Sequence, residues 1–257
     1  MDYIKEYYNH YSEDARLKSK SHLPEYLTTM RYVQKYLANG AKILEIGAGT
    51  GTYSIALAKQ GYVVDAVELV PHNIEIMKNK LTENYSVKVY EGNATNLRFL
   101  DDDTYDIVLL LGPMYHLFNE ADKLRAIQEA IRVAKQGGVI FTAYCNNDTT
   151  IYNLFNNRKI TEYIDKRYIN SEFHTESIPK LIFEFHRKND IDRIMQNFRV
   201  KRLHFIGTDM LSYYFKDSID AFSDAEFDLY MQFHYQICER QDCIGLSFHF
   251  LDVYQKE

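Results

Sequence analysis

Tryptophan is absent from this 257-residue chain, and cysteine occurs only three times, as Cys145, Cys238 and Cys243. An odd number of cysteines without paired spacing is typical neither of a disulfide framework nor of a zinc site. No stretch approaches the roughly 18 uninterrupted apolar residues that a membrane-spanning helix requires. The first residues also lack the basic segment and apolar run of a secretory signal. We therefore expect a cytoplasmic protein without a metal, a disulfide or a membrane partner.

Clustered positive charge is missing as well. The chain has 36 acidic and 30 basic residues, and its lysines and arginines are interleaved with acidic residues. Nucleic-acid affinity comes largely from clustered lysine and arginine, so this balance argues against a nucleic-acid partner. Apolar residues make up 46% of the chain and charged residues 26%, values close to the average of folded globular proteins that argue against a disordered or fibrous class.

From residue 41 onward, short β-like runs alternate regularly with helical patterns. This alternation is the signature of an α/β fold, with a mostly parallel sheet and helices on both faces. Residues 108–111 and 139–141 are apolar without alternation, as expected for central strands that are buried on both faces. The predicted strands cover residues 42–46, 62–67, 87–90, 105–111, 139–144, 200–206 and 244–254.

Residues typical of helix starts and ends mark the helices between these strands. Pro71 is suited to the first turn of one helix. Asn119 can cap another, which ends with Gly137 just beyond it. Asn189 is the predicted cap of a third helix, and Ser223 opens the capping box of a fourth.

The chain is predicted to form a single domain over residues 1–257. Residues 41–145 hold the regular alternation and form the predicted core, preceded by an N-terminal cap at residues 1–40. Residues 146–198 and 207–242 include polar and aromatic stretches too long for simple connections. We interpret them as insertions that cover the substrate.

A glycine-rich loop follows the first predicted strand. Gly47, Gly49 and Gly51 stand between that strand and a helical pattern, at a strand-to-helix turn. Glycine permits unusual backbone dihedral angles there and lets the backbone approach a ligand without a Cβ in the way. As a bare motif, the pattern is also compatible with an incidental turn.

Two carboxylates narrow the choice of ligand. Glu68 ends the second predicted strand, 21 residues after Gly47, where a carboxylate can accept hydrogen bonds from both ribose hydroxyls of an adenine nucleoside. That spacing fits either NAD or S-adenosylmethionine (SAM). Thr52, however, stands where a pyrophosphate-binding loop has glycine or alanine. Glu45 would repel a pyrophosphate but attract a cofactor with a free ammonium, so the loop favours SAM.

In this region the chain resembles the class I, Rossmann-like superfamily of SAM-dependent methyltransferases. The resemblance covers roughly residues 40–145. It implies a three-layer α/β/α fold around a seven-stranded sheet of order 3-2-1-4-5-7-6 with an antiparallel last strand, and SAM as the cofactor with S-adenosylhomocysteine as its product. The five matching motifs, in the expected order, lie at residues 45–51, 68, 91–94, 105–116 and 134–139.

The resemblance also implies which positions contact the cofactor. Many relatives carry aspartate where this chain has Asn93, whose neutral side-chain oxygen can likewise accept from the adenine amino group. The alternative is that Asn93 is simply a turn residue. The predicted cofactor contacts of the core are Glu45, Gly47, Ala48, Gly49, Gly51, Glu68, Leu69, Asn93, Ala94 and Leu111.

The tyrosine-rich N-terminal segment adds two further candidates. Aromatic faces such as that of Tyr11 can exclude water and favour a cationic methyl donor. Arg16 can pair with a carboxylate of the cofactor. We therefore add Tyr11 and Arg16 to the predicted cofactor contacts, the alternative being an amphipathic helix packed on the edge of the sheet.

Methyl transfer from a sulfonium mainly requires that nucleophile, methyl group and sulfur be held in line. A base matters when the acceptor is a protonated amine or a hydroxyl. His116 follows the fourth predicted strand at the carboxyl edge, where such sheets bind ligands, and is the candidate base. Its alternative is a packed structural histidine. Tyr115, beside it, is the second candidate in the reaction site, as a wall of the pocket.

These features predict a methyltransferase that acts on an oxygen, nitrogen or sulfur nucleophile of a small molecule. The segments outside the core are aromatic and apolar enough to enclose a pocket, and not basic enough to form an RNA track. An RNA or protein methyltransferase is the first alternative. A SAM-binding regulator without turnover is the second. The sequence determines neither the acceptor nor the oligomeric state.

Overall fold

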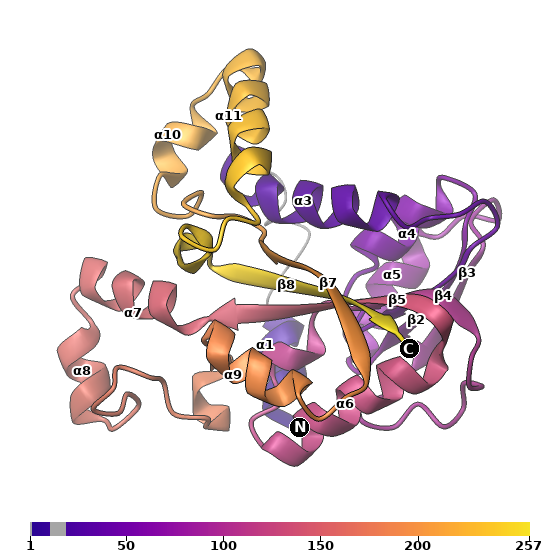
Figure 1. Ribbon diagram of the computed structural model, residues 1–257, viewed down its shortest axis with the longest axis horizontal. Helices are drawn as coiled ribbons and strands as arrows, with labels where there is room; N and C mark the ends of the chain where they lie inside the picture. The colour runs from indigo at the N-terminus through magenta and orange to yellow at the C-terminus, as the bar shows by residue number, and fades with distance from the viewer. Residues whose placement is uncertain (1, 11–18) are drawn as a thin grey trace.

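One twisted sheet forms the centre of the protein (Figure 1), as seen in a computed structural model that describes residues 2–10 and 19–257. Its strand order is β3-β2-β1-β4-β5-β8-β7, and the short β6 pairs with β5 beside this path. The strands are β1 (Lys42–Ile46), β2 (Val63–Glu68), β3 (Val87–Glu91), β4 (Tyr105–Leu110), β5 (Ala134–Asn146), β6 (Phe185–His186), β7 (Val200–Gly207) and β8 (His249–Lys256).

The pairing of these strands confirms the predicted fold. Strands β3, β2, β1, β4 and β5 run parallel to one another, whereas β8 runs antiparallel to both β5 and β7. Counted without the two-residue β6, the order is the expected 3-2-1-4-5-7-6. Strand β6 was not predicted, because its two residues are too few to carry a periodic signal.

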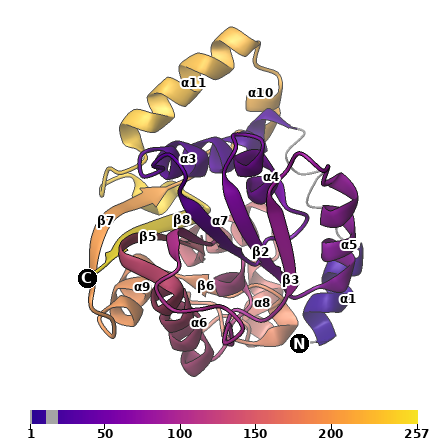
Figure 2. The same ribbon diagram turned by 90° about the vertical axis from the view of Figure 1, so that its right-hand side faces the viewer.

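Helices cover both faces of the sheet, and Figure 2 shows the layers from the side. Four 3₁₀ turns lie among them in the described part of the chain, at Lys20–His22, Pro113–Tyr115, Pro179–Leu181 and Ile244–Leu246. The α-helices of the described residues are α1 (Asp2–His10), α3 (Leu23–Gln34), α4 (Thr52–Ala58), α5 (Pro71–Lys80), α6 (Glu120–Val133), α7 (Asn147–Asn156), α8 (Ile160–Asp165), α9 (Lys188–Met195), α10 (Lys216–Asp220) and α11 (Asp224–Ile237).

The core consists of two apolar layers, because successive strand residues point to opposite faces of the sheet. On one face, Ile43 of β1 packs in a cluster with Val33 of α3 and Leu57 of α4. On the other face, its neighbour Leu44 belongs to a cluster with Ile127 of α6 and the apolar side of α9. The central strands are therefore buried on both faces, as their continuous apolar runs predicted.

The boundary between α6 and β5 differs from the prediction. Asn119 caps α6 as expected, but the helix ends at Val133 and the strand begins at Ala134 without a connecting turn. Ala134 pairs with Tyr105 of β4, which extends the ladder. Gly137, predicted to lie just beyond the helix, is therefore a strand residue with a positive φ of 76°.

Two other element starts were also predicted wrongly. Helix α9 begins at Lys188, and its first turn is held by the Asp190 carboxylate, which accepts the Arg187 N–H at 2.8 Å, so Asn189 is not the cap. The last strand begins at His249 rather than at residue 244. The preceding backbone N–H, that of Phe248, donates to a carboxylate at 2.8 Å instead of joining the ladder.

The predicted insertions project from the sheet in different directions. Helices α7 and α8 follow the carboxyl end of β5, while α10 and α11 stand out beyond α3 (Figure 1). Ile219, Phe227 and Met231 of this second unit pack with Leu23 and Leu27 at the start of α3. The role of both units as a substrate cap stays a prediction. Within the described residues, no helix is both long and apolar enough to cross a lipid bilayer.

Candidate active site

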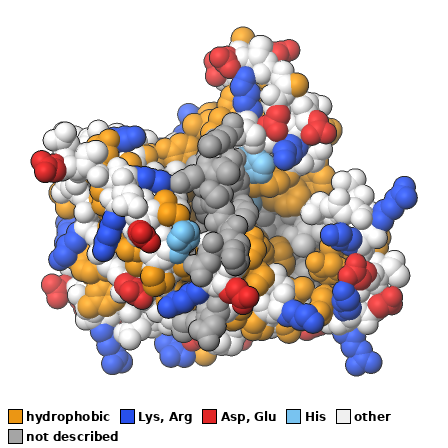
Figure 3. All heavy atoms as spheres, turned by 180° about the vertical axis from the view of Figure 1, so that it is seen from behind, with side chains coloured by type: hydrophobic (Ala, Val, Ile, Leu, Met, Phe, Trp, Pro, Cys, Tyr) orange, Lys and Arg blue, Asp and Glu red, His pale blue; other side chains and the backbone are white. Residues whose placement is uncertain are grey.

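A cavity of about 510 Å³ lies at the carboxyl ends of the central parallel strands. Hydrophobic side chains border a hollow on the side of the molecule seen in Figure 3. The cavity brings together eleven of the sequence-predicted site residues, which come from the carboxyl ends of four strands and the loops that follow them. These are Glu45, Gly47, Ala48, Gly49, Glu68, Leu69, Asn93, Ala94, Leu111, Tyr115 and His116.

The glycine loop owes its shape to left-handed backbone conformations. Gly47, Gly49 and Gly51 have φ values of 76°, 54° and 85°. A Cβ on Gly47 would lie 2.5 Å from the Pro113 ring, and one on Gly51 would lie 2.5 Å from Met77, so both positions are required by packing. A Cβ on Gly49 would meet nothing within 4 Å. Only Gly49 therefore faces open space, and Gly51 is not among the residues that line the cavity.

Glu68 ties the end of β2 to this loop. The carboxylate is 5% exposed, and its two oxygens accept the N–H groups of Gly49 at 2.8 Å and Val70 at 2.9 Å. Burial raises the pKa of Glu68, and these hydrogen bonds oppose that rise. The Asn73 side-chain N–H donates to the same oxygen as Val70 at 3.4 Å, so the oxygen bound to Gly49 is the better placed of the two to accept from a ligand hydroxyl. The sequence did not predict that this residue also holds the glycine loop in place.

Glu45 is the second buried carboxylate of the wall. Its Oε2 accepts the Ser54 N–H at 2.9 Å and also the Ser54 hydroxyl. Burial raises the pKa of Glu45 to about 8, the nearby charge of Glu68 adds to the rise, and the bonds from Ser54 oppose it. A cation placed in the cavity would favour ionised Glu45.

Asn93 acts as a turn residue, which was the alternative to an adenine contact. Its side-chain oxygen accepts both the N–H and the hydroxyl of Thr95 at 3.0 Å, which forms a turn after β3. The residue nevertheless lines the cavity. Its contact with an adenine ring stays a prediction, because the predicted acceptor atom already has two donors.

His116 is held in one tautomer. Its Nδ1 lies 2.8 Å from the Ile182 carbonyl oxygen, which can only accept, so Nδ1 carries the proton. Its Nε2 lies 2.9 Å from the Tyr8 hydroxyl and is the ring's acceptor atom when the ring is neutral. Burial lowers the pKa of His116, which favours the neutral ring. The arrangement suits a base, and the catalytic role stays a prediction.

The N-terminal helix forms part of the same wall. Ile4, Tyr7 and Tyr8 of α1 line the cavity, and Ile4 is buried. The tyrosine-rich segment therefore reaches the predicted cofactor region through its helical part. Tyr11 and Arg16, the two residues predicted there as cofactor contacts, lie outside the described residues.

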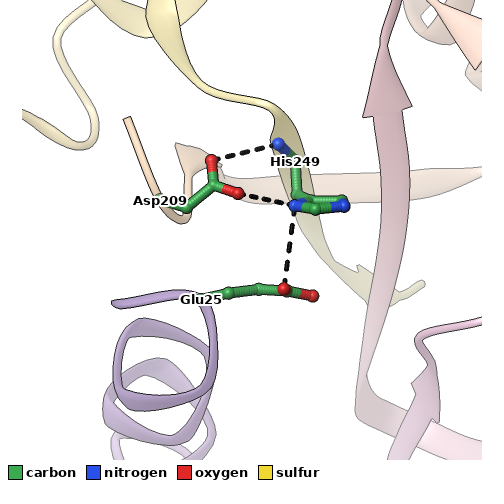
Figure 4. Close-up of side chains that lie close together, drawn as sticks. All are labelled: Glu25, Asp209 and His249. Atoms are coloured by element: carbon green, nitrogen blue, oxygen red, sulfur yellow. Dashed lines mark hydrogen bonds and ion pairs between the residues drawn. The ribbon is translucent and has the colours of Figure 1, made fainter. Parts of the chain in front are cut away.

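Three charged residues that sequence reasoning missed also converge on the cavity. Glu25 of α3, Asp209 after β7 and His249 at the start of β8 come from positions far apart in the chain (Figure 4). Glu25 and His249 line the wall, and Asp209 lies buried behind them. Placing the last strand from residue 244 hid His249 in its middle, and no local pattern singles out the other two. Only the pairing of β5 with β8 could have revealed them.

A family model described as a methyltransferase domain matches residues 43–138, the segment that supplies most of the cavity loops. The chain is similar to a solved structure from Thermotoga maritima, which is described as a SAM-dependent methyltransferase and possible histamine N-methyltransferase. The match covers all of this chain and 99% of the other, with a TM-score of 0.60 and 18% sequence identity. Residues 43–138 therefore form a methyltransferase domain, and the chain has the fold of solved SAM-dependent methyltransferases. These matches confirm the predicted resemblance and its cofactor, SAM.

Curated relatives of this chain match over shorter stretches. A demethylmenaquinone methyltransferase of Clavibacter sepedonicus is 36% identical over 101 residues, 39% of this chain and 40% of that protein. A ubiquinone biosynthesis O-methyltransferase of Haemophilus ducreyi is 26% identical over 153 residues, 58% of each chain. The chain thus spans about two fifths to three fifths of the length of these relatives. These partial matches support the assignment of the core and do not identify the methyl acceptor.

Proposed function

We propose that this chain transfers the methyl group of SAM to a small-molecule acceptor by in-line displacement. One observation carries the proposal. Most of the predicted cofactor residues line a cavity of about 510 Å³, and a second part of the same cavity has a largely aromatic wall. That volume is within the usual range for small-molecule sites, roughly 300–1,000 Å³.

The residues of the cofactor half fit SAM. The open space beside Gly49 leaves room for a ligand against the backbone. Glu45 and Glu68 place two buried carboxylates in the wall, which suits a ligand with a sulfonium and an ammonium and opposes a pyrophosphate. Glu68 would hold the ribose hydroxyls, and Glu45 would face the positive charge.

The acceptor half fits a flat organic molecule. Its wall carries five aromatic residues from four separate segments of the chain: Tyr115, Phe183, Phe185, Tyr213 and Phe248. Aromatic side chains bind planar ligands through stacked or edge contacts. The names of the relatives, which refer to demethylmenaquinone and to ubiquinone biosynthesis, agree with a cyclic acceptor of this kind.

Bound SAM supplies a methyl carbon that is already activated toward a nucleophile. The chain's own residues orient the two reactants and exclude water, for which the α1 tyrosines are placed at the wall. His116 receives a proton at Nε2 when the acceptor arrives protonated, with Tyr8 as its resting partner. Tyr115, next to His116, packs against the acceptor.

The protein should bind SAM and S-adenosylhomocysteine (SAH) and prefer both to NAD, because Glu45 and Thr52 disfavour a pyrophosphate in the loop. Isothermal titration calorimetry with the three ligands checks this. Turnover of labelled SAM in a metabolite extract, with the labelled product identified by mass, then separates an enzyme from a binding protein. Tight NAD binding without a response to either sulfur nucleoside would refute the proposal.

Binding of SAM should release protons from Glu45. Its carboxyl is largely protonated in the free protein below its pKa of about 8, and the cationic cofactor favours the ionised form. Affinity should therefore rise between about pH 6 and about pH 7, with proton release of up to one equivalent. Calorimetry in buffers of different ionisation enthalpy measures this release. Glu45→Gln should abolish it, and equal release from both proteins would assign the proton to another group.

A further inference from the structure

Glu25, Asp209 and His249 form a buried charge cluster in the acceptor half of the cavity, and Figure 4 shows how they converge. The Asp209 Oδ2 lies 2.6 Å from the His249 Nδ1, and the Glu25 Oε2 lies 3.7 Å from the same nitrogen. One ring nitrogen thus faces two carboxylates. In Figure 4 the other nitrogen, Nε2, points away from both of them.

Asp209 is fixed in its orientation. It is fully buried, and its Oδ1 accepts the Ser247 hydroxyl at 2.6 Å, the Phe248 N–H at 2.8 Å and the His249 N–H at 3.2 Å. Three donors on one oxygen fix the plane of the carboxylate and leave its second oxygen facing the ring. Its second oxygen therefore holds a proton on the His249 Nδ1 and sets the plane of the ring.

We propose that His249, held by Asp209 and Glu25, is a cationic hydrogen-bond donor for the acceptor, and that the acceptor is an oxygen acid, a phenol, enol or carboxylic acid, which reacts as its anion. This inference rests on the proposed methyl transfer and names the acceptor class of the same cavity. His249 would touch the substrate. Asp209 is then a positioning residue, because it acts through the ring.

Two histidines of opposite character therefore flank the acceptor region. The Nδ1 of His116 is paired with a neutral carbonyl, whereas that of His249 is paired with a carboxylate. The Tyr115 ring lies between them, 6.4 Å from the His116 ring and 5.9 Å from the His249 ring. One histidine is suited to receive a proton and the other to stabilise an anion, an arrangement that assigns acid and base roles.

The surroundings of His249 support its charge. The carboxylates of Glu25 and Asp209 raise its pKa well above the usual value, although burial opposes them. The other titratable groups near the ring are the thiol of Cys145, which pairs with His249 across the sheet, and the Tyr115 and Tyr213 rings. Thiols are weak hydrogen-bond partners, so a bound oxyanion would compete well for the ring's second N–H.

The proposed step balances with SAM as the co-reactant. The acceptor O–H proton passes to the His116 Nε2 and then to water. The oxygen forms a bond to the methyl carbon as the carbon–sulfur bond breaks, and that electron pair stays on sulfur. The acceptor's negative charge and the positive charge on sulfur disappear together. The product is a neutral ether or ester, which no longer attracts the His249 cation and can leave.

The geometry disfavours a metal ion in this cluster. The 2.6 Å between the His249 Nδ1 and the Asp209 Oδ2 is a hydrogen-bond length. Two metal–ligand bonds of about 2 Å each would place ligand atoms farther apart. The cluster also disfavours an amine acceptor. The cationic N–H donor of His249 would face the N–H groups of the amine, which are donors themselves.

The test uses 4-nitrophenol, whose ionised form alone is coloured, and the full-length protein saturated with SAH. The ionised form should bind roughly 10- to 100-fold more tightly than the neutral form, the value of a charge-assisted hydrogen bond. Absorbance titrations at several pH values measure this ratio. His249→Gln should reduce it to within about threefold of unity, and Asp209→Asn should reduce it in part.

The matched controls are one variant and one ligand. His204 pairs with Glu239 at 2.8 Å on the neighbouring strand, away from the cavity lining, so His204→Gln should leave the ratio unchanged. The isostere 4-nitroaniline should bind weakly and equally to all variants. The ratio in the unmodified protein is informative even where a variant does not fold.

The possible results separate the two proposals. If SAH does not bind, the proposed function fails and this inference fails with it. If SAH binds but 4-nitrophenol does not bind, or binds without preference for its anion, the inference alone is overturned. Loss of activity on chelation, restored by a divalent metal, would also overturn it by showing a metal site. A large anion preference that His249→Gln removes supports it.

Discussion

Replacing Gly49 by valine should abolish SAM binding in a protein that still folds. The valine Cβ would enter space that is open in the free protein and that the cofactor would occupy in the complex. The φ of 54° at this position is also costly for a β-branched residue, by roughly 1–2 kcal/mol or more. We expect affinity to fall below the detection limit of calorimetry, while circular dichroism still reports a cooperatively folded protein.

Gly61 provides the matched control for this substitution. It has a φ of 90°, a Cβ there would meet nothing within 4 Å, and it is exposed outside the cavity lining. Gly61→Val therefore carries the same kind of backbone strain and should lower the melting temperature similarly without affecting SAM binding. Retained SAM affinity in folded Gly49→Val would place the cofactor elsewhere.

Glu68→Ala should weaken SAM binding by roughly one to three orders of magnitude. The change would remove two charge-assisted hydrogen bonds to ribose, each worth roughly 1.5–3 kcal/mol, and entering water would recover part of the loss. It also removes the acceptors of the Gly49 and Val70 N–H groups. We therefore expect a lower melting temperature as well. Calorimetry and thermal denaturation measure the two effects.

A 2′-deoxy analogue of the cofactor distinguishes the two roles of Glu68. If the carboxylate holds the ribose, the analogue should bind the unmodified protein poorly and be less sensitive to Glu68→Ala. If both cofactors weaken by the same factor, the residue acts only by holding the glycine loop. The hydrogen bond to Gly49 makes that second result a concrete alternative, which the sequence did not reveal.

The alternation of strands and helices was readable because each element carries its own signal. Continuous apolar runs predicted the central strands, and Asn119 and Ser223 predicted helix starts that the structure contains. Glu45, Gly47 and Glu68 stand at fixed distances along one strand–loop–helix–strand unit. Such motifs are local, so the residues that line the proposed cofactor half of the cavity could be read from the sequence.

The acceptor half could not be predicted, for a physical reason. Glu25, Asp209 and His249 are separated by up to 224 positions and belong to three elements, so no spacing relates them. Their pairing exists only because β8 enters the sheet antiparallel between β5 and β7, which places His249 beside Cys145 at the carboxyl edge. Protonation of a histidine depends on the charges around it. The sequence by itself determined the fold class and the place of the glycine loop, while tertiary structure decided which charges meet in the proposed acceptor half, because that meeting depends on strand order rather than on local pattern.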